Sequence, residues 1–263
     1  MIKQSPKNLQ AAQVTYLSAE QLTINVYANY TDRVSEANTS WGSKSAAHFK
    51  KIRSVLESMN PGLNRCCYCE DSVADEVEHV RPKNLYPELT FVWDNFLYVC
   101  GQCNTIKKNK YAVVDQNNNH VVVTRMKKDP KIAPVIGGDG FVNPRKVDPL
   151  DYMYLDFSTM QYLPCYGLSV SDHEIAEFTI NILKLNQRDI LVEGRKVARK
   201  AFFALANEYA AAAQAGDQNE MNLCANSIKK SQFSTVWAEM KRQRANYAKL
   251  QAIFNAAPGL LTI

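Results

Sequence analysis

The sequence lacks any long hydrophobic run. No stretch approaches the roughly 18 consecutive apolar residues that a membrane-spanning helix needs, so we expect no membrane partner. The first residues, Met1 to Pro6, lead into polar sequence and not into the apolar core of a signal peptide, which favours a cytoplasmic location. No internal repeat is visible either.

A strong excess of charge of one sign is also missing. The net charge of +5 and the pI near 8.7 are compatible with a nucleic-acid partner, but such values are common among proteins that have none. Hydrophobic residues at 46% and charged residues at 22% are ordinary globular values, which excludes disordered and fibrous classes. With 263 residues the chain can bury a core of its own, so a metal site would organise only a local part.

Hydrophobic periodicity predicts several elements in the first part of the chain. Between Ser43 and Met59 apolar residues recur at helical spacing, and Asn60-Pro61-Gly62 supplies the stop. Before Ser43 the periodicity is weak, and only Ser18 to Gln21 suggests the start of a short helix. Two β-prone runs, Tyr111 to Asp115 and His120 to Thr124, flank a polar turn and predict a β-hairpin.

The second part of the chain turns helical after one more predicted strand at Tyr152 to Phe157. The segment Ser171-Asp172-His173-Glu174 has the spacing of a capping box at a helix start. Two longer helical runs follow, from Gln187 to Ala215 and from Asn219 to Phe254, separated by Gly216-Asp217. We therefore expect a helical scaffold at the C-terminal end.

Seven cysteines include two Cys-x-x-Cys pairs, Cys66 with Cys69 and Cys100 with Cys103. In a chain without an export signal, such pairs indicate metal binding before disulfides. Together they supply the four soft ligands that tetrahedral structural zinc prefers, although buried free thiols or a redox pair are the alternatives. Cys67 is too close to Cys69 for a knuckle and is left outside the zinc shell. The remaining cysteines, expected to be buried small hydrophobes, are Cys165 and Cys224.

The residues between and after the cysteine pairs carry a family resemblance. Glu78-His79 is followed by Asn95, and Cys103 runs into Asn104 and a series of lysines. This arrangement resembles the zinc-containing HNH endonucleases, in which a β-hairpin and a helix surround one catalytic divalent metal, Mg²⁺ or Mn²⁺. His79 is the candidate general base, because a neutral imidazole can take a proton from water near pH 7.

The resemblance also implies roles for the residues around His79. Glu78 and Asn104 would bind the catalytic metal, with Asn104 held in position by the zinc ligand that precedes it. Strand alternation would point Glu78 to the opposite side from His79, and the family often has aspartate there, so its binding to the metal depends on a bend. Asn95 would brace the loop that carries the base.

Phosphate contacts are expected from the basic residues near the motif. A lysine run alone is usually a solvated face, and its position directly after Asn104 is what favours substrate contact. The candidates are Lys107, Lys108 and Lys110, with Arg81 and Lys83 as weaker ones.

A weaker likeness extends to Asn143-Pro144-Arg145, Asp148 to Tyr152 and Leu185 to Arg188. In that fuller form the chain looks like the HNH subunits of bacterial antiphage systems, namely the Septu-type subunits and their retron-associated relatives. Those proteins work beside an ABC-type ATPase. The resemblance therefore implies a DNA-cleaving effector in an oligomeric assembly, gated by an ATPase partner that docks on the C-terminal helices.

The sequence thus predicts an α+β fold with a mainly helical scaffold, an embedded ββα-metal HNH finger with a four-cysteine zinc site, and a small β-hairpin. The expected parts are a mostly helical region at 1–62, the finger at 63–112, and the hairpin with the C-terminal helices at 113–263. The expected activity is hydrolysis of DNA to 5′-phosphate and 3′-hydroxyl ends, with RNA left open. The alternatives are a zinc-stabilised nucleic-acid-binding or adaptor subunit with little catalysis, and a redox centre.

Overall fold

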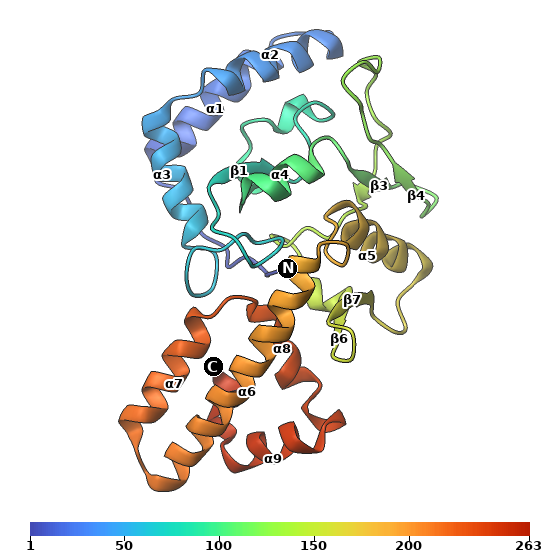
Figure 1. The fold of residues 1–263 in the computed structure, drawn as a ribbon. Coiled ribbons are helices and arrows are strands. Elements are labelled where there is room, and N and C mark those ends of the chain that lie inside the picture. The colour runs from blue at the N-terminus through green and yellow to red at the C-terminus, as the bar shows by residue number, and fades with distance from the viewer.

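A computed structural model describes residues 1–263 as an α+β fold in which about half of the residues are helical. Figure 1 shows the N-terminal helices at one end, the C-terminal helices at the other, and three small sheets between them. The expected fold class, α+β with a largely helical scaffold, is confirmed at this level. No helix combines the length and the apolar character that crossing a membrane requires.

The N-terminal part consists of α1 (Ala11–Asn25), α2 (Tyr30–Gly42) and α3 (Ala46–Glu57). The predicted helix after Ser43 is confirmed as α3, which Ser45 caps. The prediction for the residues before it was incomplete, because α1 starts earlier than Ser18 and α2 was missed. The buried face of α1 includes Gln21, whose amide donates to Pro87 O at 3.1 Å and accepts from Phe91 N at 2.8 Å. A buried glutamine of this kind hides the apolar periodicity of the helix.

The centre of the fold is a hairpin followed by a helix. β1 (Glu76–His79) pairs antiparallel with β2 (Phe96–Val99), so that His79 lies opposite Phe96. Short 3-10 turns at Pro87–Leu89 and Trp93–Asn95 lie in the connection, and α4 (Gly101–Lys107) follows β2 directly. Apolar side chains of α1 to α3 pack with Phe91 and Phe96 in a separate small core.

Two further sheets lie beside the central hairpin. β3 (Ala112–Val114), β4 (His120–Val122) and β5 (Gly138–Asp139) form a sheet in the order β4-β3-β5, which confirms the predicted hairpin. The predicted strand near Tyr152 is confirmed as β6 (Met153–Asp156), but its partner β7 (Gln161–Pro164) was missed. α5 (Val170–Ile182) is capped by Ser169, so the predicted cap at Ser171 was two residues late.

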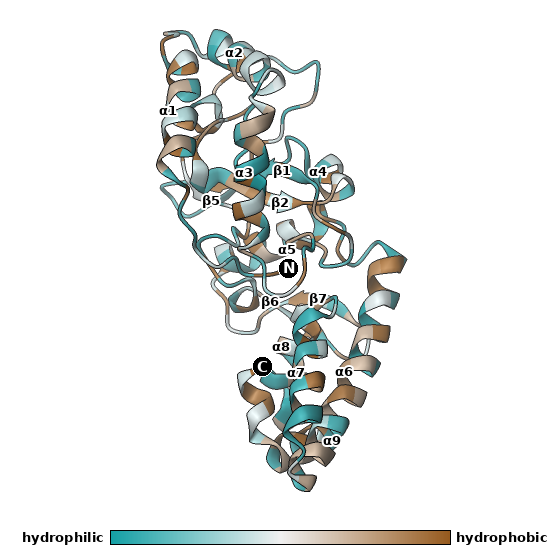
Figure 2. Cartoon of the chain, turned by 90° about the vertical axis from the view of Figure 1, so that its left-hand side faces the viewer, coloured by the Kyte–Doolittle hydropathy of each residue, from teal (hydrophilic) through white to brown (hydrophobic).

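The C-terminal helices are α6 (Asp189–Ala215), α7 (Gln218–Lys230), α8 (Ser234–Arg242) and α9 (Ala248–Ala256). Gly216 ends α6 in a left-handed conformation, as its place between the two predicted runs suggests. The second run is not one helix. It breaks at Phe233, whose φ is 57°, and again at a 3-10 turn over Arg244–Asn246. Figure 2 shows apolar and polar residues alternating along α6, and its buried side chains pack against α7, α8 and α9.

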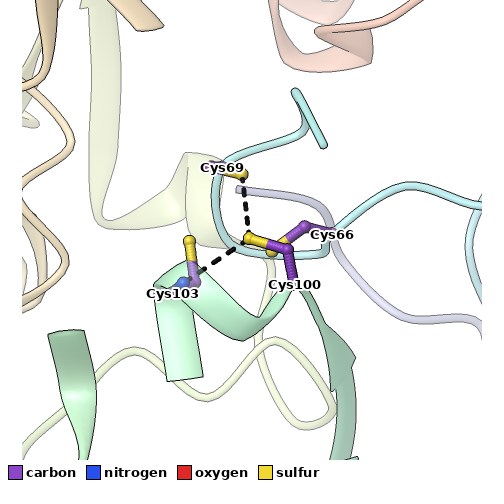
Figure 3. A group of neighbouring side chains, drawn as sticks. All are labelled: Cys66, Cys69, Cys100 and Cys103. Atoms are coloured by element: carbon purple, nitrogen blue, oxygen red, sulfur yellow. Dashed lines mark hydrogen bonds between the residues drawn. The ribbon is translucent and has the colours of Figure 1, made fainter. Parts of the chain in front are cut away.

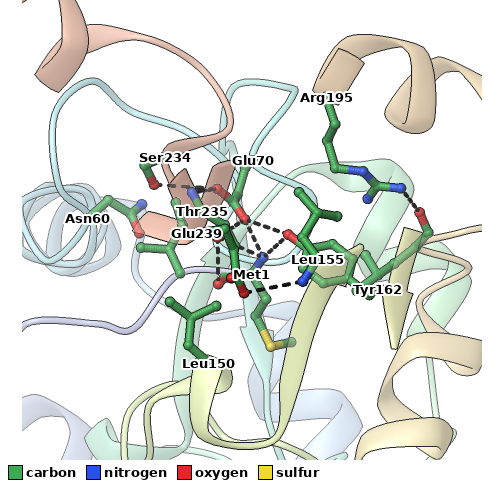
Figure 4. Close-up of polar contacts among 12 residues, drawn as sticks. Met1, Asn60, Glu70, Leu150, Leu155, Tyr162, Arg195, Ser234, Thr235 and Glu239 are labelled. Carbon is green, nitrogen blue, oxygen red and sulfur yellow. Dashed lines mark hydrogen bonds and ion pairs between the residues drawn. The ribbon is translucent and has the colours of Figure 1, made fainter. Parts of the chain in front are cut away.

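One buried carboxylate, Glu70, joins the N-terminal residue Met1 to the start of α8 (Figure 4). Glu70 directly follows Cys69 and accepts hydrogen bonds from Thr235 N at 2.8 Å and from Thr235 Oγ1 at 2.5 Å. It also forms an ion pair with the N-terminal ammonium of Met1 and accepts from Tyr162 Oη at 3.2 Å. Thr235 is in the first turn of α8, where a negative charge is favourable. Burial would raise the pKa of Glu70, but the ammonium and Thr235 hold the pKa below its usual value.

We expect Glu70→Gln to lower the free energy of unfolding by about 3–5 kcal/mol at neutral pH, the usual cost of leaving a buried charge without its partner. Since the pKa of Glu70 is lowered in the fold, its stabilisation is present at neutral pH and is lost as the pH falls through that lowered value. Urea unfolding monitored by circular dichroism at pH 7 measures the effect. Glu174→Gln, on the exposed face of α5, is the matched control and should stay within about 0.5 kcal/mol of the wild type. Equal stability of the two variants would contradict the role assigned to Glu70.

Candidate functional site

Four cysteines converge between the central hairpin and the C-terminal helices (Figure 3). Cys66 and Cys69 lie in the turn before β1, and Cys100 and Cys103 lie at the start of α4. Cys100 is the N-cap of that helix, and its Sγ accepts from Cys103 N at 3.5 Å. All four sulfur atoms lie within 4.8 Å of one another, and all four residues are buried. Cys67 is not part of the cluster, as expected.

The geometry and chemistry of the cluster fit a zinc ion. Zinc–sulfur bonds of ~2.3 Å in a tetrahedron separate the sulfur atoms by roughly 3.8 Å. The distance between Cys69 Sγ and Cys100 Sγ is 3.9 Å. Hydrogen bonds from the neighbouring thiols lower the pKa of Cys69, and the bond with Cys103 lowers the pKa of Cys100 to about 7. Burial raises the pKa of Cys66, and the bond with Cys100 raises the pKa of Cys103. A metal would displace the protons of all four thiols, and no disulfide competes for the sulfurs.

Arg188 supplies the cluster with a positive charge from the start of α6. Its Nη2 donates to Cys103 Sγ at 3.5 Å, while its buried Nε and Nη1 have no partner. Burial disfavours the charged guanidinium, but Cys103 and Cys69 raise the pKa of Arg188 above its usual value. Four thiolates around Zn²⁺ carry a net negative charge, which Arg188 would offset. In the sequence, Arg188 stands out only as part of the segment Leu185 to Arg188, and only the fold reveals this contact.

His79 is buried at the end of β1 and is held in one tautomer. Its Nε2 lies 2.8 Å from the carbonyl oxygen of Thr90, which only accepts, so Nε2 carries the hydrogen. Burial, followed by nearby lysines including Lys83, lowers the pKa of His79 to about 3, and the imidazole is neutral at pH 7. Nδ1 therefore carries the free lone pair, and it has no hydrogen-bond partner in the chain. The ring packs edge-on against Trp41, with centroids 4.3 Å apart.

Glu78 and Lys107 form a buried ion pair beside His79. The distance from Lys107 Nζ to Glu78 Oε1 is 2.6 Å, and Nζ also donates to His79 O at 2.9 Å. Burial raises the pKa of Glu78, although Lys107 opposes this effect. Lys107 has an exposed fraction of 0%, so the prediction that it contacts substrate phosphate disagrees with its place in the fold. Its ammonium lies 5.8 Å from the centre of the Phe141 ring and pairs with Glu78.

Asn104 and Glu78 have different hydrogen-bond partners. The Asn104 amide donates to Glu76 Oε2 at 2.5 Å, one turn of α4 away from Lys107. Because Glu76 and Glu78 share one face of β1, α4 pairs Asn104 with the first carboxylate and Lys107 with the second. The joint metal shell of Glu78 and Asn104 stays a prediction, because this contact engages only Nδ2 of Asn104 and leaves its Oδ1 without a hydrogen bond. Glu78 lines the same cleft as His79, and its Oε1 is the oxygen that pairs with Lys107.

Asn95 holds the loop that follows His79. Its Oδ1 accepts from Arg81 N at 2.8 Å, and its Nδ2 donates to Arg81 O at 3.0 Å and to Leu89 O at 3.0 Å. The amide thus fixes both backbone groups of the second residue after His79. It contacts no other side chain of the candidate site, and its importance for catalysis stays a prediction.

The basic candidates divide into two groups. Arg81 is used inside the fold, because its guanidinium pairs with Asp139 at 2.7 Å and lies over the rings of Tyr86 and Tyr111. Lys83 and Lys108 line a cleft of about 290 Å³ together with His79. We call this the His79 cleft, and its full lining is Glu78, His79, Pro82, Lys83, Asn84, Lys108 and Asn109. Lys110 lies in an adjoining larger cleft.

We expect the purified protein to contain about one zinc ion per chain, and Cys66→Ser and Cys103→Ser to lose most of it. Mass spectrometry of the metal content measures the outcome. Cys67→Ala is the matched control, since it removes an adjacent buried thiol that is outside the cluster and should leave the zinc content unchanged. Metal-free wild-type protein, or equal loss in the control, would contradict the assignment.

We expect Arg188→Gln to weaken zinc binding about 10–100-fold, the usual effect of removing a group that supports metal ligands. Competition with a chromogenic chelator measures the affinity. Lys196→Gln removes one positive charge from the exposed face of the same helix and serves as the control. Equal zinc affinities of the two variants would show that Arg188 contributes only to packing.

Similarity to a known protein extends over part of the chain. The chain is 34% identical to the Septu protein PtuB of Bacillus thuringiensis over an alignment of 112 residues, which covers 37% of this chain and 40% of that protein. The matched part thus spans about two fifths of that relative's length. No family model matches the chain, and no solved structure matches it. The chain is thus similar to a Septu protein over part of its length.

Proposed function

We propose that the protein is a metal-dependent endonuclease of the HNH type that acts in antiphage defence. The observation that carries the proposal is the state of His79, a neutral imidazole that Thr90 holds through Nε2 and that lines a polar cleft. The order of hairpin, helix and cysteine cluster supports the HNH assignment. The partial similarity to the Septu protein PtuB supports the role in defence.

The chemistry assigned to the His79 cleft is hydrolysis of a phosphodiester. His79 Nδ1 takes a proton from the attacking water, and the Thr90 carbonyl stabilises the ring by accepting from Nε2 as the imidazole becomes charged. Asn95 keeps the loop after His79 in place, so the base holds its orientation. Lys83 and Lys108 contact the phosphate oxygens from the cleft wall.

A divalent ion fits beside Glu78 in a limited way. Mg²⁺ at phosphoryl-transfer centres binds one or two carboxylates together with substrate phosphates, and it needs no complete cage of protein ligands. Glu78 offers one carboxylate oxygen, Oε2, because Lys107 takes the other. When bound, the ion would stabilise negative charge on the phosphate and on the leaving oxygen. Asn104 stays a second candidate ligand through Oδ1, because only its Nδ2 is engaged by Glu76.

The substrate and partner follow from the HNH and Septu likenesses together. We assign DNA as the substrate, and an ABC-type ATPase as the partner that controls cleavage. The C-terminal helices α6 to α9 are the assigned docking region, because they lie at the far end of the molecule from α1 and α2 (Figure 1). There a partner can bind without covering the His79 cleft.

A second candidate function is a zinc-stabilised adaptor that binds nucleic acid without cutting it. The Glu78–Lys107 ion pair is the observation that favours it. An ammonium 2.6 Å from the carboxylate already neutralises the group expected to bind the catalytic metal. The adaptor would keep the cysteine cluster and the basic clefts but would not turn over substrate.

We expect His79→Ala to reduce DNA cleavage by a factor of about 10²–10⁴, the usual contribution of a general base. The assay follows plasmid and linear DNA with Mg²⁺ or Mn²⁺, with and without the product of the neighbouring gene. His173→Ala is the matched control, because His173 is exposed on α5 and does not line the His79 cleft.

Two results would reject the nuclease. Cleavage by His79→Ala at the wild-type rate would remove His79 from the mechanism. Zinc-loaded wild-type protein that binds DNA but never cuts it, with either metal and with the product of the neighbouring gene present, would establish the adaptor instead.

A further inference from the structure

A larger cleft of about 780 Å³ adjoins the His79 cleft. The two share Asn84, Lys108 and Asn109, so they form one continuous depression along the end of α4. We call the larger one the basic cleft. Its lining also includes residues of α2 and of the segment between β4 and β5. Both lie outside the β1–β2 hairpin and α4. Its charged lining residues are Lys108, Lys110, Arg125, Lys127, Asp129, Lys131 and Lys184.

The wall of the basic cleft is held in place by a buried arginine. Arg125 has an exposed fraction of 9%, and its guanidinium donates to Tyr30 Oη at 3.0 Å and to the carbonyl oxygens of Asn84 and Ile132. Lys131 Nζ donates to Ser35 Oγ at 2.7 Å and ties the same segment to α2. The segment between β4 and β5 is therefore built into the molecule, and the cleft is formed before any ligand binds.

The charge of the basic cleft is not neutralised by the fold. Six of its lining residues are basic and one is acidic. The carboxylate of Asp129 is engaged by Met126 N at 2.6 Å. No acidic group lies within ion-pair distance of Lys108, Lys110, Lys127 or Lys184. A preformed concave surface with several unpaired cations attracts a polyanion.

Lys108, which lines both clefts, has a strained backbone. Its φ of 46° and ψ of −125° lie in a region that almost only glycine occupies without cost, at the position directly after α4. Its amide completes the helix end by donating to Asn104 O at 2.8 Å. A glycine would satisfy this position with less strain, yet the chain has a lysine there. Strain that the surrounding structure maintains points to a function for the side chain.

We propose that the basic cleft binds the sugar-phosphate backbone of the nucleic-acid strand on one side of the phosphate that lies at His79, with Lys108 between the two clefts. This inference rests on the proposed function, since it takes the His79 cleft as the place of the scissile phosphate. The lining contains no aromatic side chain on which a base could stack. Binding through the backbone is accordingly independent of sequence.

The first test measures binding without catalysis. Fluorescence anisotropy follows a labelled 20-base-pair DNA duplex and its single strand in EDTA over a series of salt concentrations. For the duplex we expect Lys127→Gln with Lys184→Gln to lower the slope of log K against log salt by about 1.8, and to weaken binding at least ~10-fold at low salt. Lys128→Gln is the matched control, because Lys128 is exposed next to Lys127 but does not line the cleft.

The second test separates a functional lysine from a structural one. We expect Lys108→Gly to relieve the backbone strain and raise the melting temperature by about 2–4 °C, while weakening DNA binding and lowering the salt slope. The two readouts move in opposite directions only if the side chain is kept for the ligand. A higher melting temperature with unchanged binding would overturn the role of Lys108.

The outcomes also separate this inference from the proposed function. Unchanged affinity and slope in the Lys127 and Lys184 double variant would overturn the basic cleft, whatever the cleavage assay shows. Equal dependence on these lysines for a labelled polyglutamate peptide would overturn recognition of phosphates. Conversely, cleft-dependent binding by a wild-type protein that never cuts DNA would support the cleft and reject the nuclease.

Discussion

Four sulfur atoms brought together in the interior dominate the electrostatics of this fold. Thiolates gathered within a few ångströms repel one another and need a cation among them, and a bound Zn²⁺ would bring together the two segments that carry them. The first segment leads into β1, and the second joins β2 to α4. The cluster thus connects the hairpin with α4, and the contacts of Arg188 and Glu70 connect the cysteine segments with α6 and α8. The C-terminal helices are connected electrostatically to the cysteine turn as well as packed beside it.

The position of α4 over β1 determines which partners the residues between Glu76 and Lys108 have. Antiparallel pairing of β1 with β2 brings His79 to the end of the hairpin that is remote from the cysteines. α4 runs back along the same strand, so its residues pair in order with Glu76 and then with Glu78. Beyond the helix the chain turns at Lys108 into the wall of both clefts. The cysteine cluster and the His79 cleft therefore occupy opposite ends of one short helix.

Local patterns predicted the features that depend on local chemistry. The cysteine spacing gave the four-thiol cluster, and the polar turn before His120 gave the β3–β4 hairpin. Features that depend on distant partners were missed. The buried Gln21 makes α1 look irregular until its contacts with Pro87 and Phe91 are known. Lys107 looks like the other lysines of its run, and only the side of α4 that faces Glu78 distinguishes it. The positive φ values of Lys108 and Phe233 could not be predicted either, because neither side chain is of a type that favours this backbone conformation.

The Glu78–Lys107 pair shows how the same residues serve stability and function. A carboxylate buried at this depth without a cation would be costly, and its pKa would rise further than it does. Lys107 offsets that cost through Oε1 and, by donating to the backbone carbonyl of His79, also ties the end of β1 to α4. A single carboxylate thus anchors α4 to β1 while its residue still lines the cleft that contains His79. Pairing with Lys107 and exposure to the cleft are therefore compatible in the same side chain.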